Sequence, residues 1–320
     1  MTTLQYISNY PSYFFKEDII LMELNDWILT TITGSDSKNY LQNKITININ
    51  SINKNNHMLC AHCNINGKVW SNLRLFRLNE TSYMYLQRKS ISNKQIQEFK
   101  KYSIFSNITI CNKADLYLLG IIGTSVKKRL SQYFKKLPNK NLPVYYQNEI
   151  ILLWFSDPFE RFLLISEKNN IILKKILKLT KIIHDSNLWL ALDISCKYPI
   201  IDKEMSGKFL PQSLNLENLN GLDFKKGCYY GQEMVSKAQF KKLNKYNLYW
   251  LIGESNRIVH IGERIEIEDN KEWRKVGYIL AVSRINETTI WIQAILRKNI
   301  TVNNIIRIEN DLNNNLYVQT

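Results

Sequence analysis

Apolar residues recur along this chain in three successive patterns, and each pattern predicts a different arrangement of elements. In the first third, runs of β-forming residues predict strands at 27–33, 58–65, 69–78 and 83–87. The dipeptide Asn-Gly at 66–67 predicts a hairpin between two of these strands. Capping residues at 35–37 predict the start of a short helix, and residues 93–101 have the spacing of a second helix.

The second pattern predicts a layered α+β unit in the middle of the chain. Its runs follow the order strand, helix, strand, strand, helix, at 115–122, 123–134, 150–154, 161–165 and 168–179. This order is typical of a ferredoxin-like layer. The lysines in its two helices are interpreted as solvated faces.

From residue 246 onward the chain has only short strand-like runs, at 248–252, 264–267, 276–282, 289–295 and 305–308. This spacing without helices predicts a small antiparallel barrel. The three patterns therefore predict two α+β regions followed by a C-terminal β-barrel. The Asn-rich end at 312–320 is expected to form a loosely ordered tail.

The chain is strongly basic, and two explanations of its charge stay open. Its 320 residues include 43 Lys and Arg against 28 Asp and Glu, a formal net charge of +15. A basic surface attracts phosphate, which favours a nucleic-acid partner. However, the chain has 42 Ile, 37 Asn and 32 Lys but only 11 Arg, the usage expected of A+T-rich codons. Codon drift explains the charge equally well, because each Asp-to-Asn change adds positive charge without selecting for a partner.

Hydropathy argues against a membrane protein. The longest nearly uncharged apolar stretch, 116–126, is too short to span a bilayer. Residues 1–10 lack a basic head followed by an apolar core, so we expect no secretory signal and a cytoplasmic location.

The cysteines do not predict a disulfide framework or a metal site. Their odd number argues against systematic pairing, and they are scattered at Cys60, Cys63, Cys111, Cys196 and Cys228. Cys60 and Cys63 form a CxxC beside His57 and His62, but a metal site requires further ligands at suitable spacing. A strand at 58–65 would also direct the two sulfurs to opposite faces. We therefore expect no bound metal.

The segment 223–240, DFKKGCYYGQEMVSKAQF, concentrates the candidate chemistry. Gly227 and Gly231 flank Cys228, and a helical run begins at about Gln232, which places the cysteine at a turn entering a helix. Six Lys and one Glu lie between residues 225 and 245. Positive charge and a helix N-terminus both stabilise a thiolate, so Cys228 is the candidate reactive thiol. The alternative is a small buried residue in a tight turn.

The stretch KGCYYGQEMVSKAQF, which begins at Lys226, resembles the KGCYxGQE signature of the YgfZ family. These are folate-binding proteins of the GcvT-like superfamily, connected with tRNA modification and the maintenance of iron–sulfur proteins. Further segments resemble the family in the same order along nearly the whole chain: LNDWILTTITGSDSKNYLQ, AHCNINGKVWSNLRLFR, LWLALDI, GKFLPQSLNLE and KEWRKVGYILAV. The resemblance implies a three-domain α+β fold like that of a glycine-cleavage aminomethyltransferase, with a central folate-sized cavity and a C-terminal antiparallel β-barrel. Its expected domains are an N-terminal folate-binding α+β domain of residues 1–112 plus 184–243, a ferredoxin-like α+β domain of 113–183 and a C-terminal β-barrel of 244–320.

The resemblance also implies site residues. The family's tetrahydrofolate-binding tryptophans match Trp27 and Trp189, whose indole faces would stack on the flat rings of the folate. Taken alone, both tryptophans lie in apolar runs typical of a core. Lys226 is expected either to favour the thiolate of Cys228 or to attract the folate glutamate tail. Residues of the motif that support Cys228 are Lys226, Gly227, Tyr229, Gly231, Gln232 and Glu233.

Three functions follow from these features. Where the aminomethyltransferases carry an acidic pair, this chain has Ser71 and Asn72, which supply no carboxylate acid or base. The leading hypothesis is therefore a monomeric, folate-binding accessory factor for tRNA modification and iron–sulfur protein assembly or repair. Its cofactor would be tetrahydrofolate or a one-carbon derivative, and its transient partners would be iron–sulfur enzymes or assembly factors. The second hypothesis is an enzyme, a folate-dependent methyl or aminomethyl transferase on an unknown acceptor.

The third hypothesis is a non-enzymatic RNA-binding module. No RNA-reading motif is visible, and aromatic residues are not interleaved with the basic cluster at 225–245. Direct contact with tRNA therefore stays open at this point.

Overall fold

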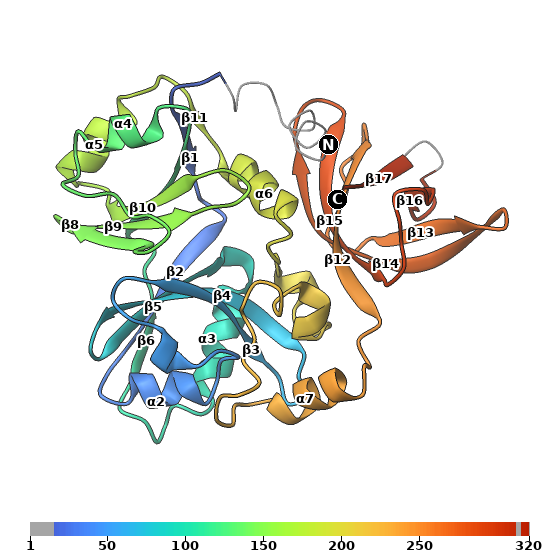
Figure 1. Cartoon of the computed structure of the whole chain (residues 1–320), viewed down its shortest axis with the longest axis horizontal. Helices are drawn as coiled ribbons and strands as arrows, with labels where there is room; N and C mark the ends of the chain where they lie inside the picture. Colours follow the sequence, from blue (N-terminus) through green and yellow to red (C-terminus); the bar gives the residue numbers. More distant parts are fainter. Residues whose placement is uncertain (1–15, 312–314, 320) are drawn as a thin grey trace. The chain divides into compact units, whose positions relative to one another are not determined.

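The computed structural model describes residues 16–311 and 315–319 (Figure 1). Residues 1–10, in which the sequence predicts no secretory signal, lie outside the described residues. The chain divides into two compact units, one formed by Met1–Asn25 and Ala114–Trp189 and the other by Asp26–Lys113 and Leu190–Thr320. This division differs from the expected domain boundaries, because residues 16–25 join the middle region and the barrel joins the N-terminal sheet. The three-domain boundaries remain a prediction.

The first unit is a six-stranded sheet covered by helices. The strands follow the order β11-β1-β7-β10-β9-β8 and are antiparallel except for the pair β1–β11. Their bounds are β1 (Ile20–Glu23), β7 (Leu116–Ile122), β8 (Val144–Gln147), β9 (Ile150–Phe155), β10 (Arg161–Glu167) and β11 (Ile183–His184). Helices α4 (Val126–Leu130) and α5 (Ile171–Leu177) bury Leu130, Leu173 and Ile176 against this sheet. Helix α4 ends at Leu130, one turn before the expected residue 134. Helix α6 (Ser186–Ser195) follows β11.

The second unit begins with a five-stranded antiparallel sheet in the order β3-β4-β5-β2-β6. Its strands are β2 (Trp27–Thr33), β3 (His57–Cys63), β4 (Val69–Asn79), β5 (Ser82–Arg88) and β6 (Thr109–Asn112). The expected hairpin joins β3 to β4, and Gly67 adopts a positive φ of 71° in its turn. The helices on this sheet are α2 (Ser37–Gln42) and α3 (Ser92–Lys100), with the short 3-10 helices η2 (Ile49–Ser51) and η3 (Lys89–Ile91).

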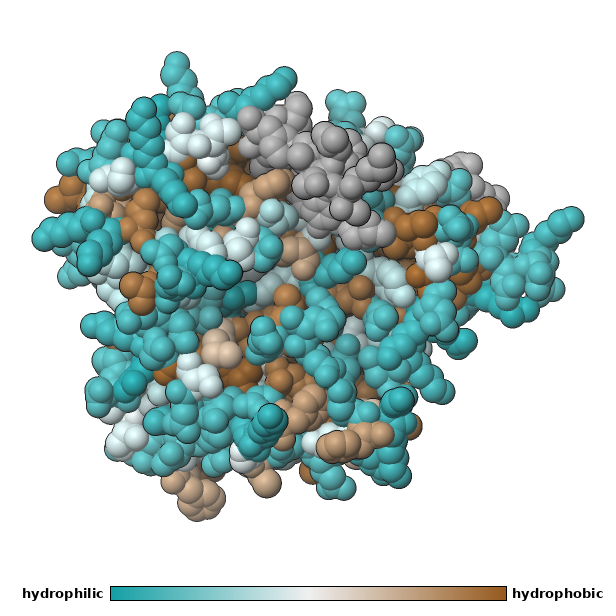
Figure 2. Space-filling model, in the orientation of Figure 1, coloured by the Kyte–Doolittle hydropathy of each residue, from teal (hydrophilic) through white to brown (hydrophobic). Residues whose placement is uncertain are grey.

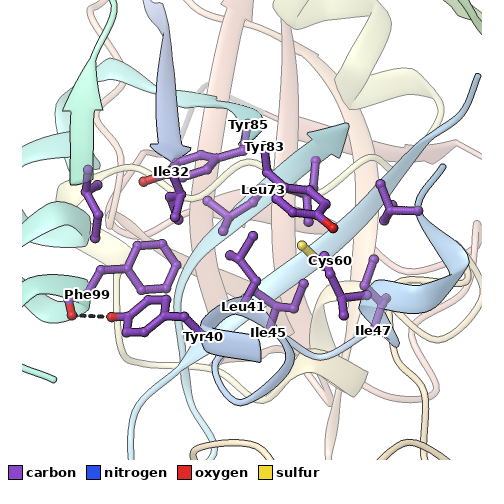
Figure 3. Close-up of a cluster of buried hydrophobic side chains, with 14 residues drawn as sticks. Ile32, Tyr40, Leu41, Ile45, Ile47, Cys60, Leu73, Tyr83, Tyr85 and Phe99 are labelled. Atoms are coloured by element: carbon purple, nitrogen blue, oxygen red, sulfur yellow. Dashed lines mark hydrogen bonds between the residues drawn. The ribbon is translucent and has the colours of Figure 1, made fainter. Parts of the chain in front are cut away.

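The two faces of this sheet bury different cores. On one face, side chains of α2 and α3 pack on the strands, and Cys60 and the ring of Phe99 lie among them (Figure 3). The hydroxyl of Tyr40 donates a hydrogen bond to the carbonyl of Phe99, which links the two helices across this core. On the other face, Leu59 and Cys63 pack with residues from 201–216 and from the barrel. Alternation along β3 therefore sends neighbouring side chains into separate cores.

The C-terminal region is a closed six-stranded barrel, as the spacing of short strands predicts. Its strands are β12 (Tyr246–Glu254), β13 (Arg264–Asp269), β14 (Glu272–Arg284), β15 (Thr289–Arg297), β16 (Ile306–Ile308) and β17 (Asn315–Gln319). The expectation of a loose tail is wrong for residues 315–319, because β17 pairs with β12 and β16 and closes the barrel. Leu316 is buried in the barrel core, and this burial of apolar surface stabilises β17 although the surrounding sequence is rich in Asn.

Between the sheet and the barrel, the chain forms η4 (Lys203–Met205), η5 (Pro211–Leu214) and α7 (Gln232–Phe240). The side chain of Gln293 in β15 ties this region to the barrel, since it accepts a hydrogen bond from the amide of Ile200 and donates one to the carbonyl of Tyr198. The face drawn in Figure 2 is covered mainly by hydrophilic residues, with hydrophobic residues in separate patches. Among the helices of residues 16–311 and 315–319, none is long and apolar enough to cross a membrane.

Candidate functional site

Cys228 lies on an exposed turn that is held at both ends by buried residues. Gly227 and Cys228 are exposed, whereas Lys226 before them and Tyr229 after them are each only 6% exposed. Helix α7 begins at Gln232, as the sequence predicts, with Gly231 as its N-cap. The loop therefore presents the thiol to solvent between two anchors, which excludes a small buried residue in a tight turn.

Lys226 is the first anchor. Its ammonium nitrogen donates hydrogen bonds to the carbonyl oxygens of Gln42, Ile45 and Ile47, at 2.6, 2.7 and 2.8 Å. It also lies 5.1 Å from the centroid of the Tyr229 ring. These three carbonyls take all three N–H groups of an ammonium. Burial lowers the pKa of Lys226 to about 8.

Both roles expected of Lys226 stay predictions, and the structure shows that its N–H groups are engaged elsewhere. An ammonium whose donors are all engaged by backbone carbonyls has none left for a folate carboxylate or for the Cys228 sulfur. The physical reason lies in segment 42–47, which leaves carbonyl groups unpaired at the end of α2 and in the loop beyond it. The sequence shows the lysine but not its acceptors, which are about 180 positions away.

The tyrosines of the motif form the second anchor. The amide of Tyr230 donates to the carbonyl of Asn43 at 3.0 Å, and the Tyr229 amide donates to the side-chain oxygen of Gln232 at 3.2 Å. The Tyr230 hydroxyl lies 3.1 Å from the hydroxyl of Tyr102, and this hydrogen bond raises the pKa of Tyr230 to about 12. Gln232 thus caps the turn locally, while Tyr230 connects it to residues distant in sequence.

The structure requires glycine at only one of the two glycine positions of the motif. Gly231 has a φ of 87°, and a Cβ there would lie 2.3 Å from the carbonyl oxygen of Asn64 in the β3–β4 turn. A Cβ at Gly227 would meet nothing within 4 Å, and its φ lies outside the left-handed region. The packing of the described residues therefore requires glycine at 231 but not at 227. Glu233 is exposed in the first turn of α7, where a carboxylate interacts favourably with the helix dipole.

Cys60 and Cys63 are buried, unlike Cys228, and Cys196 is half-buried. Burial raises the pKa of Cys60 to about 12 and also raises that of Cys63, which keeps both thiols protonated at neutral pH. The two sulfurs enter opposite cores of the sheet, which confirms the alternation expected along β3. Cys111 is exposed on the edge strand β6. Within residues 16–311 and 315–319, no group of three or more His, Cys, Asp or Glu is placed to hold a metal ion.

Trp27 lies beside a charged group that the sequence did not reveal. It faces Arg88 across the β2–β5 pair, and the Arg88 guanidinium lies 4.3 Å from the indole centroid. Asp202 accepts hydrogen bonds from the Arg88 Nε at 3.1 and 3.2 Å, and Ser90 donates a further hydrogen bond to the same carboxylate. Nη1 of Arg88 is buried and has no partner among the described residues. Trp27 itself is 7% exposed.

Trp189 is packed in the first unit. It is 1% exposed, the Arg161 guanidinium lies 4.2 Å from its ring centroid, and Phe155 meets it edge-on with centroids 5.4 Å apart. A Cβ on Gly120 would lie 2.5 Å from the indole, so the ring fills all the space that the strand leaves. As the structure stands, Trp189 has no open face for a ligand ring.

Ser71 and Asn72 are buried on β4 and supply no carboxylate. Ser71 Oγ donates towards Gln87 Oε1 at 3.2 Å, and the Asn72 amide donates to the carbonyl of Pro199 at 2.7 Å. These contacts are those of residues that stabilise a fold rather than of an acid–base pair.

Comparison with known proteins identifies the family. The model for the YgfZ β-barrel domain matches residues 244–311. Over 305 residues the chain is 50% identical to the tRNA-modifying protein YgfZ of Buchnera aphidicola subsp. Baizongia pistaciae, which covers 95% of this chain and 96% of that one. Over 303 residues it is 41% identical to the tRNA-modifying protein YgfZ of Yersinia enterocolitica, covering 94% and 91%. This chain belongs to the YgfZ family.

A solved structure extends the comparison to the fold. The glycine cleavage system aminomethyltransferase T from Bartonella henselae matches with a TM-score of 0.72 at 12% identity, covering 97% of this chain and 89% of that one. The GcvT-like fold expected from the sequence, with its C-terminal β-barrel, is thereby confirmed.

Sequence reasoning found the motif of this YgfZ-family chain but missed the residues that position it. Arg88 and Asp202 lie in segments without a visible motif, and Tyr102 follows the end of α3. Arg88 directly follows the predicted strand 83–87, and only the register of β2 against β5 in the structure places it across from Trp27.

Proposed function

We propose that this chain is a folate-binding accessory factor that acts in tRNA modification and in iron–sulfur protein assembly or repair, with Cys228 as its reactive thiol. The observation that carries the proposal is the exposed pair Gly227–Cys228 between buried anchors. A structural cysteine needs no such presentation, whereas a nucleophilic thiol must be accessible to its electrophile. The tRNA-modifying proteins to which the chain is 41% and 50% identical support the connection with tRNA.

The residues around Trp27 fit part of a folate. Arg88 covers one face of the indole, so a pterin or aminobenzoyl ring would stack on the opposite face, and since Trp27 is only 7% exposed this contact requires neighbouring side chains to move. The unpartnered Arg88 Nη1 would donate to a carbonyl or carboxylate oxygen of the ligand, because a buried donor gains most from an acceptor. Asp202 holds the guanidinium in this orientation through Nε. A bound tetrahydrofolate would supply or accept a one-carbon unit.

Trp189 fits less well. Its ring is enclosed by Arg161 and Phe155, so contact with a ligand requires those side chains to move. We therefore assign the first ring contact to Trp27 with Arg88, and keep Trp189 as the second contact that the family resemblance implies.

The folate assignment is tested by calorimetric titration with 5-formyltetrahydrofolate, a stable reduced folate. Trp27→Phe and Arg88→Met should each weaken binding at least about fivefold, as expected for the loss of a ring contact or a charge-assisted hydrogen bond. Trp273→Phe is the matched control, because Trp273 also carries an arginine, Arg307, 3.7 Å from its ring but lies in the barrel. Absence of saturable binding by the unmodified chain, or equal effects of all three variants, would remove the folate assignment.

The thiol assignment is tested in cells that lack the protein. Cys228→Ser should fail to restore methylthiolated tRNA, whereas Cys111→Ser, which changes the other well-exposed cysteine, should restore it. Mass spectrometry of Cys228 in the purified protein separates the accessory factor from a one-carbon transferase. A one-carbon adduct would favour the transferase, and a persulfide or mixed disulfide would favour the accessory factor.

A further inference from the structure

Five lysines around α7 and the Cys228 loop face solvent. Anchoring removes Lys226 from the basic cluster, and the remaining members are all exposed: Lys225, Lys237, Lys241, Lys242 and Lys245. None of the five forms a salt bridge with the residues that the structure describes. These five charges lie in the same short segment as the thiol, and Glu233 is the acidic residue of helix α7.

Helix α7 arranges part of this charge around an exposed ring. Its exposed residues are Glu233, Lys237 and Phe240, and Lys241 follows directly at the C-cap. These positions are spaced i, i+4, i+7 and i+8, so they form one stripe along the helix. Phe240 is 81% exposed, with lysines directly before and after it on this stripe.

A second aromatic group lies at the other end of the loop. The rings of Tyr230 and Tyr102 have centroids 5.3 Å apart, and Tyr102 is 46% exposed. The Lys44 ammonium lies 3.8 Å from the Tyr102 ring centroid. Tyr230 and Phe240 lie between lysines of the 225–245 cluster in the sequence itself, so the expectation that aromatic residues are not interleaved with the cluster is wrong.

We propose that the stripe of α7, with Lys225 and the Tyr102–Tyr230 pair, is a surface that binds an unpaired segment of tRNA next to Cys228. Lysine ammonium groups neutralise phosphates, and exposed rings stack on unpaired bases. An acidic protein is the less fitting partner, because the cores of protein interfaces are depleted in lysine, whereas nucleic-acid interfaces are strongly basic. This inference goes beyond the proposed function, since it requires neither folate nor chemistry at the thiol.

The test measures the affinity of the full chain for an unmodified tRNA transcript, by fluorescence anisotropy at several salt concentrations. In Lys237→Gln/Lys241→Gln, the slope of log affinity against log salt should fall in magnitude by about 1.4, or about 0.7 for each phosphate that a lysine no longer neutralises. Phe240→Ala should weaken binding at least about fivefold with the slope unchanged, because stacking is not a counterion effect. Both changes are at exposed positions, so circular dichroism should show an unchanged fold.

The matched control is Lys174→Gln/Lys175→Gln on α5, which removes the same charge from two other exposed helical lysines. It should leave affinity and slope within error of the unmodified chain. Equal losses in the α5 and α7 variants would show diffuse electrostatic attraction and overturn the proposal. Wild-type tRNA affinity in the α7 variants would also overturn it, and would leave an acidic protein as the partner of this surface.

Discussion

Replacing Lys226 by methionine tests whether this lysine anchors the Cys228 loop or acts on its thiol. Methionine keeps the unbranched apolar stem but leaves the carbonyls of Gln42, Ile45 and Ile47 without their donor. Hydrogen bonds from a charged donor contribute about 1.5–3 kcal/mol each, so three contribute about 5–9 kcal/mol. Such contributions are not additive within one buried group, and removing one partner of a buried charged contact typically costs about 3–5 kcal/mol. We therefore expect the loop to be held about 3 kcal/mol less firmly in Lys226→Met.

Hydrogen exchange of backbone amides measures this change locally. The amide of Tyr230 bonds to the carbonyl of Asn43, and the amide of Asp223 bonds to that of Thr46. A loss of about 3 kcal/mol should accelerate exchange of both amides by about 100-fold, provided that they exchange through local opening. Amides in the barrel strands should be unaffected.

Lys225→Met is the matched control, because Lys225 is the exposed neighbour and carries the same charge. It should leave the exchange of these amides unchanged. Unchanged exchange in Lys226→Met, together with slower alkylation of Cys228, would refute the anchor and restore an electrostatic role for the lysine.

Two further predictions concern buried and turn positions. Gly231→Ala should destabilise the second unit by about 2 kcal/mol or more, because its Cβ would overlap the Asn64 carbonyl and its positive φ is strained for alanine. Gly227→Ala should cost less than about 0.5 kcal/mol, because a Cβ there would meet nothing within 4 Å. Equal urea unfolding midpoints for the two variants would contradict this prediction. Burial, with Lys44 nearby, lowers the pKa of His62 to about 3 although Gln95 lies within hydrogen-bond distance. In the unfolded chain His62 binds a proton near pH 6.5, whereas in the folded chain it stays neutral down to about pH 3. The free energy of unfolding, which is highest above pH 6.5, should therefore fall by about 2 kcal/mol at pH 5. Urea unfolding of His62→Gln at the two pH values should show a correspondingly smaller loss.

Strand and helix positions were largely readable from the sequence, because they depend on local periodicity. The expected run at 27–33 is β2, the Asn-Gly pair joins β3 to β4, and α7 begins at Gln232. The sequence-based expectations were wrong where pairing between segments distant in sequence decides whether a strand forms. Residues 315–319 look like a polar tail, but they form β17 because the open edges of β12 and β16 need a partner.

The sequence by itself determined the family, the fold class and the position of the motif, since these follow from residue order and short-range spacing. Only the tertiary structure decided what the motif residues do. Lys226 finds its acceptors in segment 42–47, and Tyr230 finds Tyr102, through contacts between residues more than 120 positions apart. Such contacts leave no periodic signal, because they depend on how loops meet after the sheet has formed. The lysine that seemed to act on the thiol is engaged by the backbone, and Cys228 is left exposed between its anchors.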